Sequence, residues 1–162
     1  MEEYKNYKKI LMRKAVEKAR RTMNENIGGP FGAVITDKDG YVIAVNSNRV
    51  LADHDPTAHA EITAIREAAK RLGTHDLSGC TMYATGYPCP MCLSAMIWAN
   101  IKVCYYGNAP KDAEEIGFRD DFIYRFINDG CKDEKIMTFE QIGHEECIKL
   151  FKEYKEKEKE IY

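Results

Sequence analysis

The stretch Pro88-Cys89-Pro90-Met91-Cys92 decides how this chain folds and what it can bind. Its two cysteines are three positions apart, so on a helix their sulfurs lie on one face of the first turn. Pro90 suits the first helical position, where its missing N–H would have had no partner. The free backbone N–H groups of that turn favour negative charge, and so favour the thiolate form of both cysteines. The stretch therefore predicts a helix that opens with two metal-binding sulfurs.

A second stretch, His59-Ala60-Glu61, supplies what two thiolates lack. Residues two apart on a helix point in nearly opposite directions. His59 and Glu61 can therefore serve one pocket only if a helix begins there and meets the pocket with its end. Asp55-Pro56-Thr57, directly upstream, offers the capping residue and the proline that such a start requires. We therefore expect the N-termini of two helices to converge on one site.

The combined pattern His-x-Glu … Pro-Cys-x-x-Cys is typical of zinc-dependent nucleobase deaminases, in which the glutamate moves protons and does not bind the metal. An imidazole and two thiolates hold zinc through three protein ligands and leave the fourth position for water, as catalytic sites do. We predict one Zn²⁺ per subunit, bound by His59, Cys89 and Cys92. Glu61 is predicted to act as the general acid and base.

Two other interpretations of the cysteine pair remain open. A Cys-x-x-Cys in a reduced protein can be a redox pair or half of a structural zinc knuckle. A structural site needs four protein ligands, and a redox pair leaves His59 and Glu61 without a role. The remaining cysteines form no second pair of this kind: Cys80, Cys104, Cys131 and Cys147.

The composition is that of an ordinary globular chain, with 162 residues of which 44% are hydrophobic and 31% charged. We expect a single domain over residues 1–162. The formal net charge of −2 argues against dedicated binding of nucleic acid or of an anionic membrane. Neither an apolar signal core nor a membrane span is found in the sequence. We therefore expect a cytoplasmic protein whose cysteines are reduced or metal-bound.

The order of segments predicts an α/β fold, a three-layer α/β/α sandwich. An amphipathic helix is expected over residues 4–24 and a β-hairpin over 31–45, and helices and strands alternate after that. The last predicted strand, 136–142, follows a helix and would lie parallel to the strand at 102–107. The prediction is a mixed five-stranded sheet with helices on both faces, and a site at the carboxyl end of the strand that leads to Cys89.

Several segments of this sequence resemble the cytidine deaminase-like superfamily, and within it the bacterial guanine deaminases. The segments span nearly the whole chain: Gly28–Ile35, Asp55–Glu61, Pro88–Cys92, Gly117–Tyr124 and the terminal tyrosine. The metal motifs are specific for the superfamily, and the other segments narrow the branch. The resemblance implies a hydrolase that converts a free purine base, guanine, to xanthine and ammonia. Tyr87 is a departure, because many relatives carry Glu at that position.

The resemblance also implies the contacts made with the substrate. Asn48 would bond the purine edge, Phe31 and Trp98 would lie against the base, and Asp120 would help to handle the amino group. Plainer roles remain open for all of them, namely a turn residue for Asn48, core positions for the two aromatic residues and a loop charge for Asp120.

The resemblance further implies a homodimer in which the charged helical tail, residues 145–162, crosses to the partner subunit. The terminal Tyr162 would then seal the partner's pocket against water. This explains why a strongly charged helix ends in the apolar pair Ile161-Tyr162. Read without the resemblance, the same segment is a fraying, solvated end.

Other substrates and one non-enzymatic role are the alternatives. The same zinc chemistry can act on guanosine, cytosine or tRNA adenosine. A tRNA enzyme should bind RNA with a steep salt dependence, which the acidic composition does not favour. The non-enzymatic alternative is a structural zinc-binding module without turnover.

Overall fold

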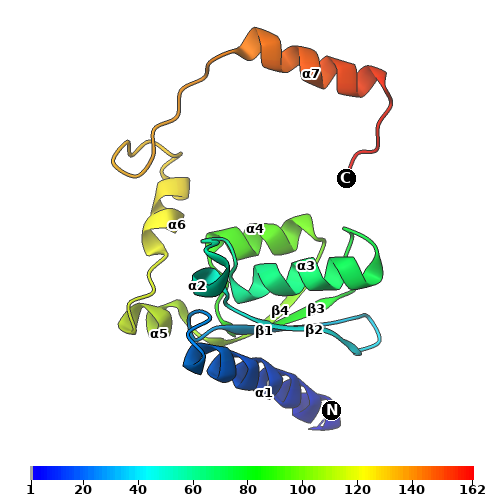
Figure 1. The fold of residues 1–162 in the computed structure, drawn as a ribbon, viewed down its shortest axis with the longest axis vertical. Coiled ribbons are helices and arrows are strands. Elements are labelled where there is room, and N and C mark those ends of the chain that lie inside the picture. Colours follow the sequence, from blue (N-terminus) through cyan, green and yellow to red (C-terminus); the bar gives the residue numbers. More distant parts are fainter. Residues whose placement is uncertain (1) are drawn as a thin grey trace. The chain divides into compact units, whose positions relative to one another are not determined.

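A computed structural model describes residues 2–162, with side chains from residue 5 onward. The chain divides into two compact units, the first ending at Asp120 and the second running from Asp121 to Tyr162. In chain order the first unit contains α1 (Glu2–Asn24), β1 (Gly32–Thr36), β2 (Val42–Ser47), α2 (Val50–Asp53), α3 (Ala60–Leu72), β3 (Thr81–Gly86), α4 (Pro90–Trp98), β4 (Val103–Asn108) and α5 (Pro110–Glu115). Figure 1 shows these elements.

The sheet is mixed, and its four strands lie in the order β2-β1-β3-β4. β1 pairs antiparallel with β2 and with β3, whereas β3 and β4 are parallel. The parallel pair is joined by α4, and the antiparallel pair β1–β2 by the predicted hairpin turn. The ends of β3 and β4 therefore lie at one edge of the sheet, where the chain also enters α4.

The predicted fifth strand is wrong. Residues 136–142 form a turn followed by irregular chain in the second unit, and the side chains of Ile136 and Ile142 are 40% and 79% exposed. The apolar residues of this segment, at 136, 137, 139 and 142, do not keep the period of two that places one face of a strand on a core. β-propensity without that alternation did not produce a strand.

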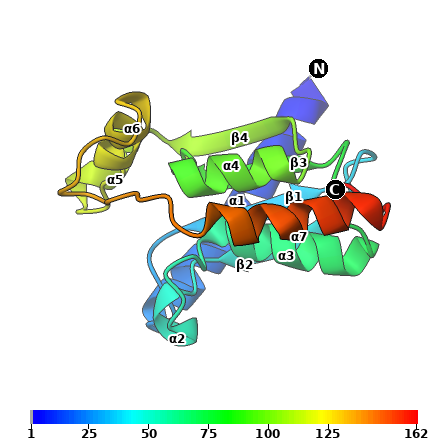
Figure 2. The ribbon, with the colours of Figure 1, turned by 90° about the horizontal axis from the view of Figure 1, so that it is seen from above.

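Helices cover both faces of the sheet, as predicted (Figures 1 and 2). On one face α1 packs Leu11 and Ala15 against Val34 and Tyr83. The opposite face carries the larger core, to which α3 and α4 contribute. Its fully buried members include many alanines, which let α3 approach the strands closely: Ala33, Ala44, Ala60, Ala64, Ala68 and Ala84. Alternate residues along each strand thus build the three layers.

Close packing of α1 on the sheet depends on Gly32 at the start of β1. A Cβ atom at this position would lie 2.1 Å from the carbonyl oxygen of Ala15 and 3.2 Å from the Cβ of Ala19. No side chain fits between the helix and the strand there. Gly32 therefore determines how near α1 lies to the sheet.

The second unit consists of α6 (Asp121–Asn128), α7 (His144–Glu156) and the chain between and after them. Phe126 is buried and its ring lies 6.3 Å from that of Phe139, nearly parallel to it. The tail is helical as predicted, although α7 ends at Glu156 and the last six residues are not helical. No helix among the described residues combines the length and the apolar character that crossing a membrane requires.

Candidate metal centre

His59 and Cys89 occupy equivalent places at the starts of two helices. Each is the residue before the first helical turn, His59 for α3 and Cys89 for α4, and both have an extended backbone with φ of −65°. Pro90 fills the first position of α4, as expected from the sequence. α3 begins at Ala60. The sequence predicted an earlier start, with Asp55 as the capping residue. Asp55 instead accepts hydrogen bonds from Thr57 in a turn that precedes the helix.

The three predicted ligands meet at one point. The Nδ1 atom of His59 lies 3.5 Å from the Sγ atom of Cys89 and 3.6 Å from that of Cys92. A tetrahedral zinc ion with bonds of about 2.3 Å to sulfur and about 2.0 Å to nitrogen would separate these atoms by roughly 3.5 Å. Among the described residues, this trio is the group of histidine, cysteine and carboxylate ligands close enough to share a metal ion. The donor set and its spacing therefore fit zinc.

Glu61 lies in the first turn of α3, beside this trio. Its side chain is buried, and one carboxylate oxygen accepts a hydrogen bond from the Cys92 sulfur at 3.5 Å. Burial raises the pKa of Glu61, because desolvation penalises the carboxylate. A carboxyl group whose pKa moves toward neutrality is suited to taking up and returning a proton.

The pKa values of the two cysteines shift in opposite directions. The hydrogen bond from Cys92, with a further contribution from His59, lowers the pKa of Cys89 to about 4. The pKa of Cys92 is raised, first by its hydrogen bond with Cys89 and then because it is buried near Glu61. One thiolate is thus already favoured, and a dication near both sulfurs would supply the charge that favours the second.

Asp120 lies within electrostatic reach of the centre. The pKa of His59 is raised, first by its hydrogen bond with Cys89 and more weakly by the charges of Glu61 and Asp120. Asp120 is partly buried and follows α5 at the end of the first unit. A residue far along the chain from either metal motif is therefore placed near them by the fold.

Asn48 is buried just after β2 and braces the glycine-rich turn. Its Oδ1 atom accepts hydrogen bonds from the backbone N–H groups of Gly29, at 3.2 Å, and Val50, at 3.1 Å. Its own backbone N–H donates to the carbonyl of Phe31 at 2.9 Å. The turn role that the sequence left open is thus present, and it occupies the oxygen of the side chain.

Phe31 belongs to an aromatic pair that sequence reasoning did not assign. Its ring meets that of Phe118 edge to face, with centroids 5.0 Å apart and planes at 87°. A Cβ atom added to Gly86, at the end of β3, would lie 3.6 Å from the ring of Phe31. Phe118 lies two residues before Asp120, and this was the available signal that it belongs near the site. Nothing in the sequence linked it to Phe31.

The structure does not bring Trp98 to the ligands. Trp98 ends α4, six residues after Cys92, which is about 9 Å along the helix axis. Its side chain is 78% exposed, so it is not a core residue. Tyr162 belongs to the second unit and is 84% exposed. The substrate contacts assigned to these two residues remain predictions.

Comparison with known proteins identifies the family. The profile of the cytidine and deoxycytidylate deaminase zinc-binding region matches residues 5–108, which include all three ligands and Glu61. This chain belongs to that deaminase family. The catalytic arrangement of zinc therefore replaces the redox and structural alternatives, and Glu61 occupies the position of the glutamate that serves as acid and base in zinc deaminases.

Similar members of this deaminase family include enzymes of two kinds. Guanine deaminase of Bacillus subtilis is 45% identical over 89% of this chain and 91% of its own length. The crystal structure of guanine deaminase from that organism matches with a TM-score of 0.88, at 42% identity, over 95% of this chain and 98% of that one. A tRNA-specific adenosine deaminase of Haemophilus influenzae is 32% identical over 93% of this chain and 84% of its length.

Proposed function

We propose that this protein hydrolyses guanine to xanthine and ammonia. The observation that carries the proposal is the site itself, a buried Glu61 against a zinc-type ligand trio, within a chain 45% identical to a guanine deaminase along 89% of its length. The match in structure extends to 98% of the length of a guanine deaminase, so the resemblance includes the regions outside the metal motifs.

The side chains divide the work of a hydrolysis. His59, Cys89 and Cys92 would hold the zinc, which would lower the pKa of a bound water toward neutrality. Glu61 takes a proton from the water as its oxygen adds to the carbon that bears the amine and delivers it to the adjacent ring nitrogen, and then carries the remaining hydroxyl proton to the amine nitrogen. The carbon–nitrogen bond then breaks, ammonia leaves and the carbon becomes a carbonyl. Asp120, whose charge acts on the same site, assists at the amino group.

The aromatic pair and the tail complete the proposed binding site. Phe31, held edge to face by Phe118, lies along one side of the base, and Asn48 bonds the edge of the purine. Trp98 and Tyr162 close the site in the assembled protein rather than in one chain. Both of them carry large exposed apolar surfaces, which favours a role in contacts between subunits.

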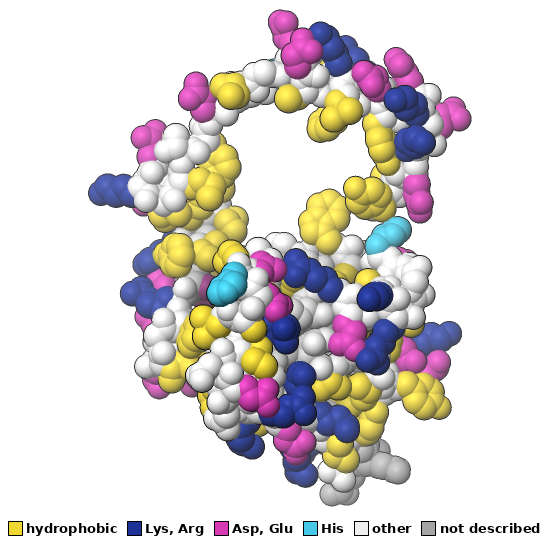
Figure 3. All heavy atoms as spheres, in the orientation of Figure 1, with side chains coloured by type: hydrophobic (Ala, Val, Ile, Leu, Met, Phe, Trp, Pro, Cys, Tyr) yellow, Lys and Arg dark blue, Asp and Glu magenta, His cyan; other side chains and the backbone are white. Residues whose placement is uncertain are grey.

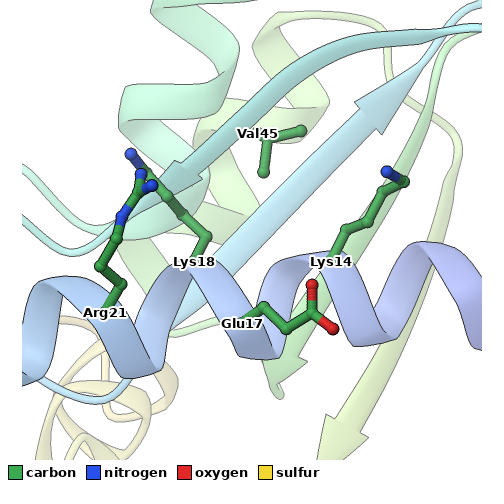
Figure 4. Close-up of a pocket in the computed structure, with 5 residues that line it drawn as sticks. All are labelled: Lys14, Glu17, Lys18, Arg21 and Val45. Atoms are coloured by element: carbon green, nitrogen blue, oxygen red, sulfur yellow. The ribbon is translucent and has the colours of Figure 1, made fainter.

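Free guanine is proposed over a tRNA substrate because the guanine deaminase relative is 45% identical to this chain and the tRNA-specific relative 32%. Figure 4 shows Lys14, Lys18 and Arg21 of α1 beside Val45 of β2, where they line a groove of about 390 Å³. α1 covers the face of the sheet opposite to α3 and α4 (Figure 1). This groove therefore lies across the sheet from the metal ligands, apart from the proposed guanine site.

A panel of substrates tests the proposal. Purified zinc-loaded protein is given guanine, guanosine, adenine, cytosine and tRNA, and the released ammonia is measured. We expect turnover of guanine to exceed that of the other four substrates. Faster release from tRNA, with a steep decrease as salt rises, would replace guanine by the tRNA alternative. If the protein binds zinc stoichiometrically but releases ammonia from none of the substrates, the structural zinc-binding module is the remaining alternative.

The proposed functional form is a homodimer with exchanged tails. Large hydrophobic side chains on α7 and beyond it are exposed in the single chain, as Figure 3 shows along this helix. On α7 they recur at helical spacing, and together with the end of the chain they are Leu150, Phe151, Tyr154, Ile161 and Tyr162. On α4, Ile97 and Trp98 are 65% and 78% exposed. Burial of such surfaces between subunits would stabilise the dimer.

We also propose a cytoplasmic location. All six cysteines are free thiols, and two of them must remain reduced to bind zinc. A reducing compartment meets this requirement.

A further inference from the structure

The side-chain amide of Asn48 has one possible orientation. Two backbone N–H groups, of Gly29 and Val50, point at the same side-chain atom from 3.2 and 3.1 Å. A backbone N–H can only donate, so the atom that faces both must be the oxygen. The opposite orientation would place an NH₂ donor against two donors. Nδ2 is therefore directed away from the turn, and it donates no hydrogen bond within the described part of the chain.

Gly28 makes this arrangement possible by lacking a side chain. A Cβ atom at Gly28 would lie 2.3 Å from the backbone oxygen of Asn48 and 2.4 Å from its Oδ1. Both distances are far inside van der Waals contact, and the closer atom is backbone, which cannot rotate away. Gly28 is not in the left-handed region of φ. Glycine is therefore required here because a side chain has no space, and not because of the backbone conformation. Any other residue must displace Asn48.

We propose that Gly28 is a positioning residue for substrate recognition, holding Asn48 so that Nδ2 donates to a hydrogen-bond acceptor on the base. This rests on the proposed function, because it requires Asn48 to contact the purine. The base is then recognised through a carbonyl oxygen or an unprotonated ring nitrogen, and guanine carries both. A base that offers only a donor at that point leaves two donors facing each other, which selects against it.

The first test removes the donor and keeps the turn. In Asn48→Asp the carboxylate can still accept from Gly29 and Val50, but it has no N–H to give the base. Binding is measured by equilibrium dialysis of labelled guanine in a Glu61→Gln background, which separates affinity from turnover. We expect Kd to rise at least about tenfold, the effect of one lost hydrogen bond with a buried group left unpaired. Zinc content should not change.

The second test acts through Gly28. Gly28→Ala should weaken guanine binding to a similar extent, because the new methyl group displaces the amide. The double variant Gly28→Ala/Asn48→Asp should bind no more weakly than Asn48→Asp, since Gly28 acts only through the donor. Gly73→Ala is the control: its methyl group meets nothing within 4 Å, although its backbone φ of +68° lowers stability. Its guanine affinity should equal that of the parent.

The outcomes separate this inference from the proposed function. Wild-type protein is first assayed for ammonia release from guanine, and no release would refute the function. If guanine is deaminated but Asn48→Asp or Gly28→Ala binds it within twofold of the parent, the inference is wrong. If Gly28→Ala yields no folded protein, the test is made by NMR on the parent protein, through the signal of the Asn48 side-chain NH₂ group. A shift of that signal on binding guanine supports the inference, and an unchanged signal overturns it.

Discussion

At the scale of single residues, the proposed acid and base role of Glu61 can be tested separately from the binding of the metal. Glu61→Gln keeps the size and the burial of the side chain but removes its ability to take up a proton. We expect turnover of guanine to fall by about 10²-fold or more with the zinc content unchanged. Ammonia release and metal analysis on the same preparation would show this.

Glu67→Gln is the matched control for this change. Glu67 lies on the same helix, where its carboxylate pairs with Arg71 and accepts from Asn46 instead of facing the metal ligands. Its variant should turn over guanine at the wild-type rate. Equal activity of the Glu61 variant and this control would disprove the acid and base role.

Residue-level chemistry was the part most open to prediction from the sequence. His59, Glu61, Cys89 and Cys92 were assigned because each motif supplies its ligands within one short stretch, and local spacing determines which side chains share a helix end. Phe118 was not assigned, because its contact with Phe31 joins residues 87 positions apart.

At the scale of elements, the N-termini of α3 and α4 meet at the three metal ligands. Removal of zinc by a chelator should loosen both first turns together, because His59 and Cys89 precede them and would lose their common partner. If the free zinc concentration before chelation is a thousand times its Kd, we expect the free energy of unfolding to fall by about 4 kcal/mol when the zinc is removed. Thermal unfolding measures the loss, and hydrogen exchange locates it.

A ligand variant distinguishes metal loss from a direct effect of the chelator. His59→Ala removes one of three ligands and should already have the lower melting temperature. Adding chelator to it should change that temperature little. An equal drop in wild type and variant would contradict a stabilising ion at this site.

The contact of α1 with β1 is the second element-scale feature that can be tested. Gly32→Ala places a methyl group against the Ala15 carbonyl at 2.1 Å, so helix and strand must separate. We expect about 1–3 kcal/mol less stability, the usual cost of overpacking. Urea denaturation of this variant and of Gly86→Ala, whose methyl group would meet Phe31 at an ordinary 3.6 Å, gives the comparison. A loss no larger in Gly32→Ala than in this control would show that α1 can move.

At the scale of the whole molecule, exchange of tails can be detected by mixing two inactive proteins. If Tyr162 seals the partner's pocket, one subunit with Glu61→Gln and another with Tyr162→Ala together form one site with both residues intact. Random reassembly makes about half of the dimers mixed, and each mixed dimer has one of its two sites restored, so about a quarter of the wild-type activity should be recovered. Ammonia release before and after mixing is the measurement.

A folded-back tail gives the opposite result, because each site then carries the defects of its own chain. No recovery on mixing, with heterodimers verified by mass, would refute the exchange. Two copies of Glu61→Gln mixed with each other provide the baseline.

The sequence by itself determined the local features of this protein: the metal motifs, the hairpin, the helix starts and the alternation that places helices on both faces of the sheet. These depend on residues near one another in the chain, where spacing and backbone chemistry act directly. Its prediction of a fifth strand failed, because a strand needs a partner and a period of two as well as β-forming residues.

Only the tertiary structure decided which distant groups meet. It placed the charge of Asp120 near His59, and it directed the oxygen of Asn48 into the glycine turn and its nitrogen away from that turn. Both results depend on packing between segments that the sequence does not order relative to each other. Buried polar groups must find partners in the fold, and the fold alone determines which partners are within reach.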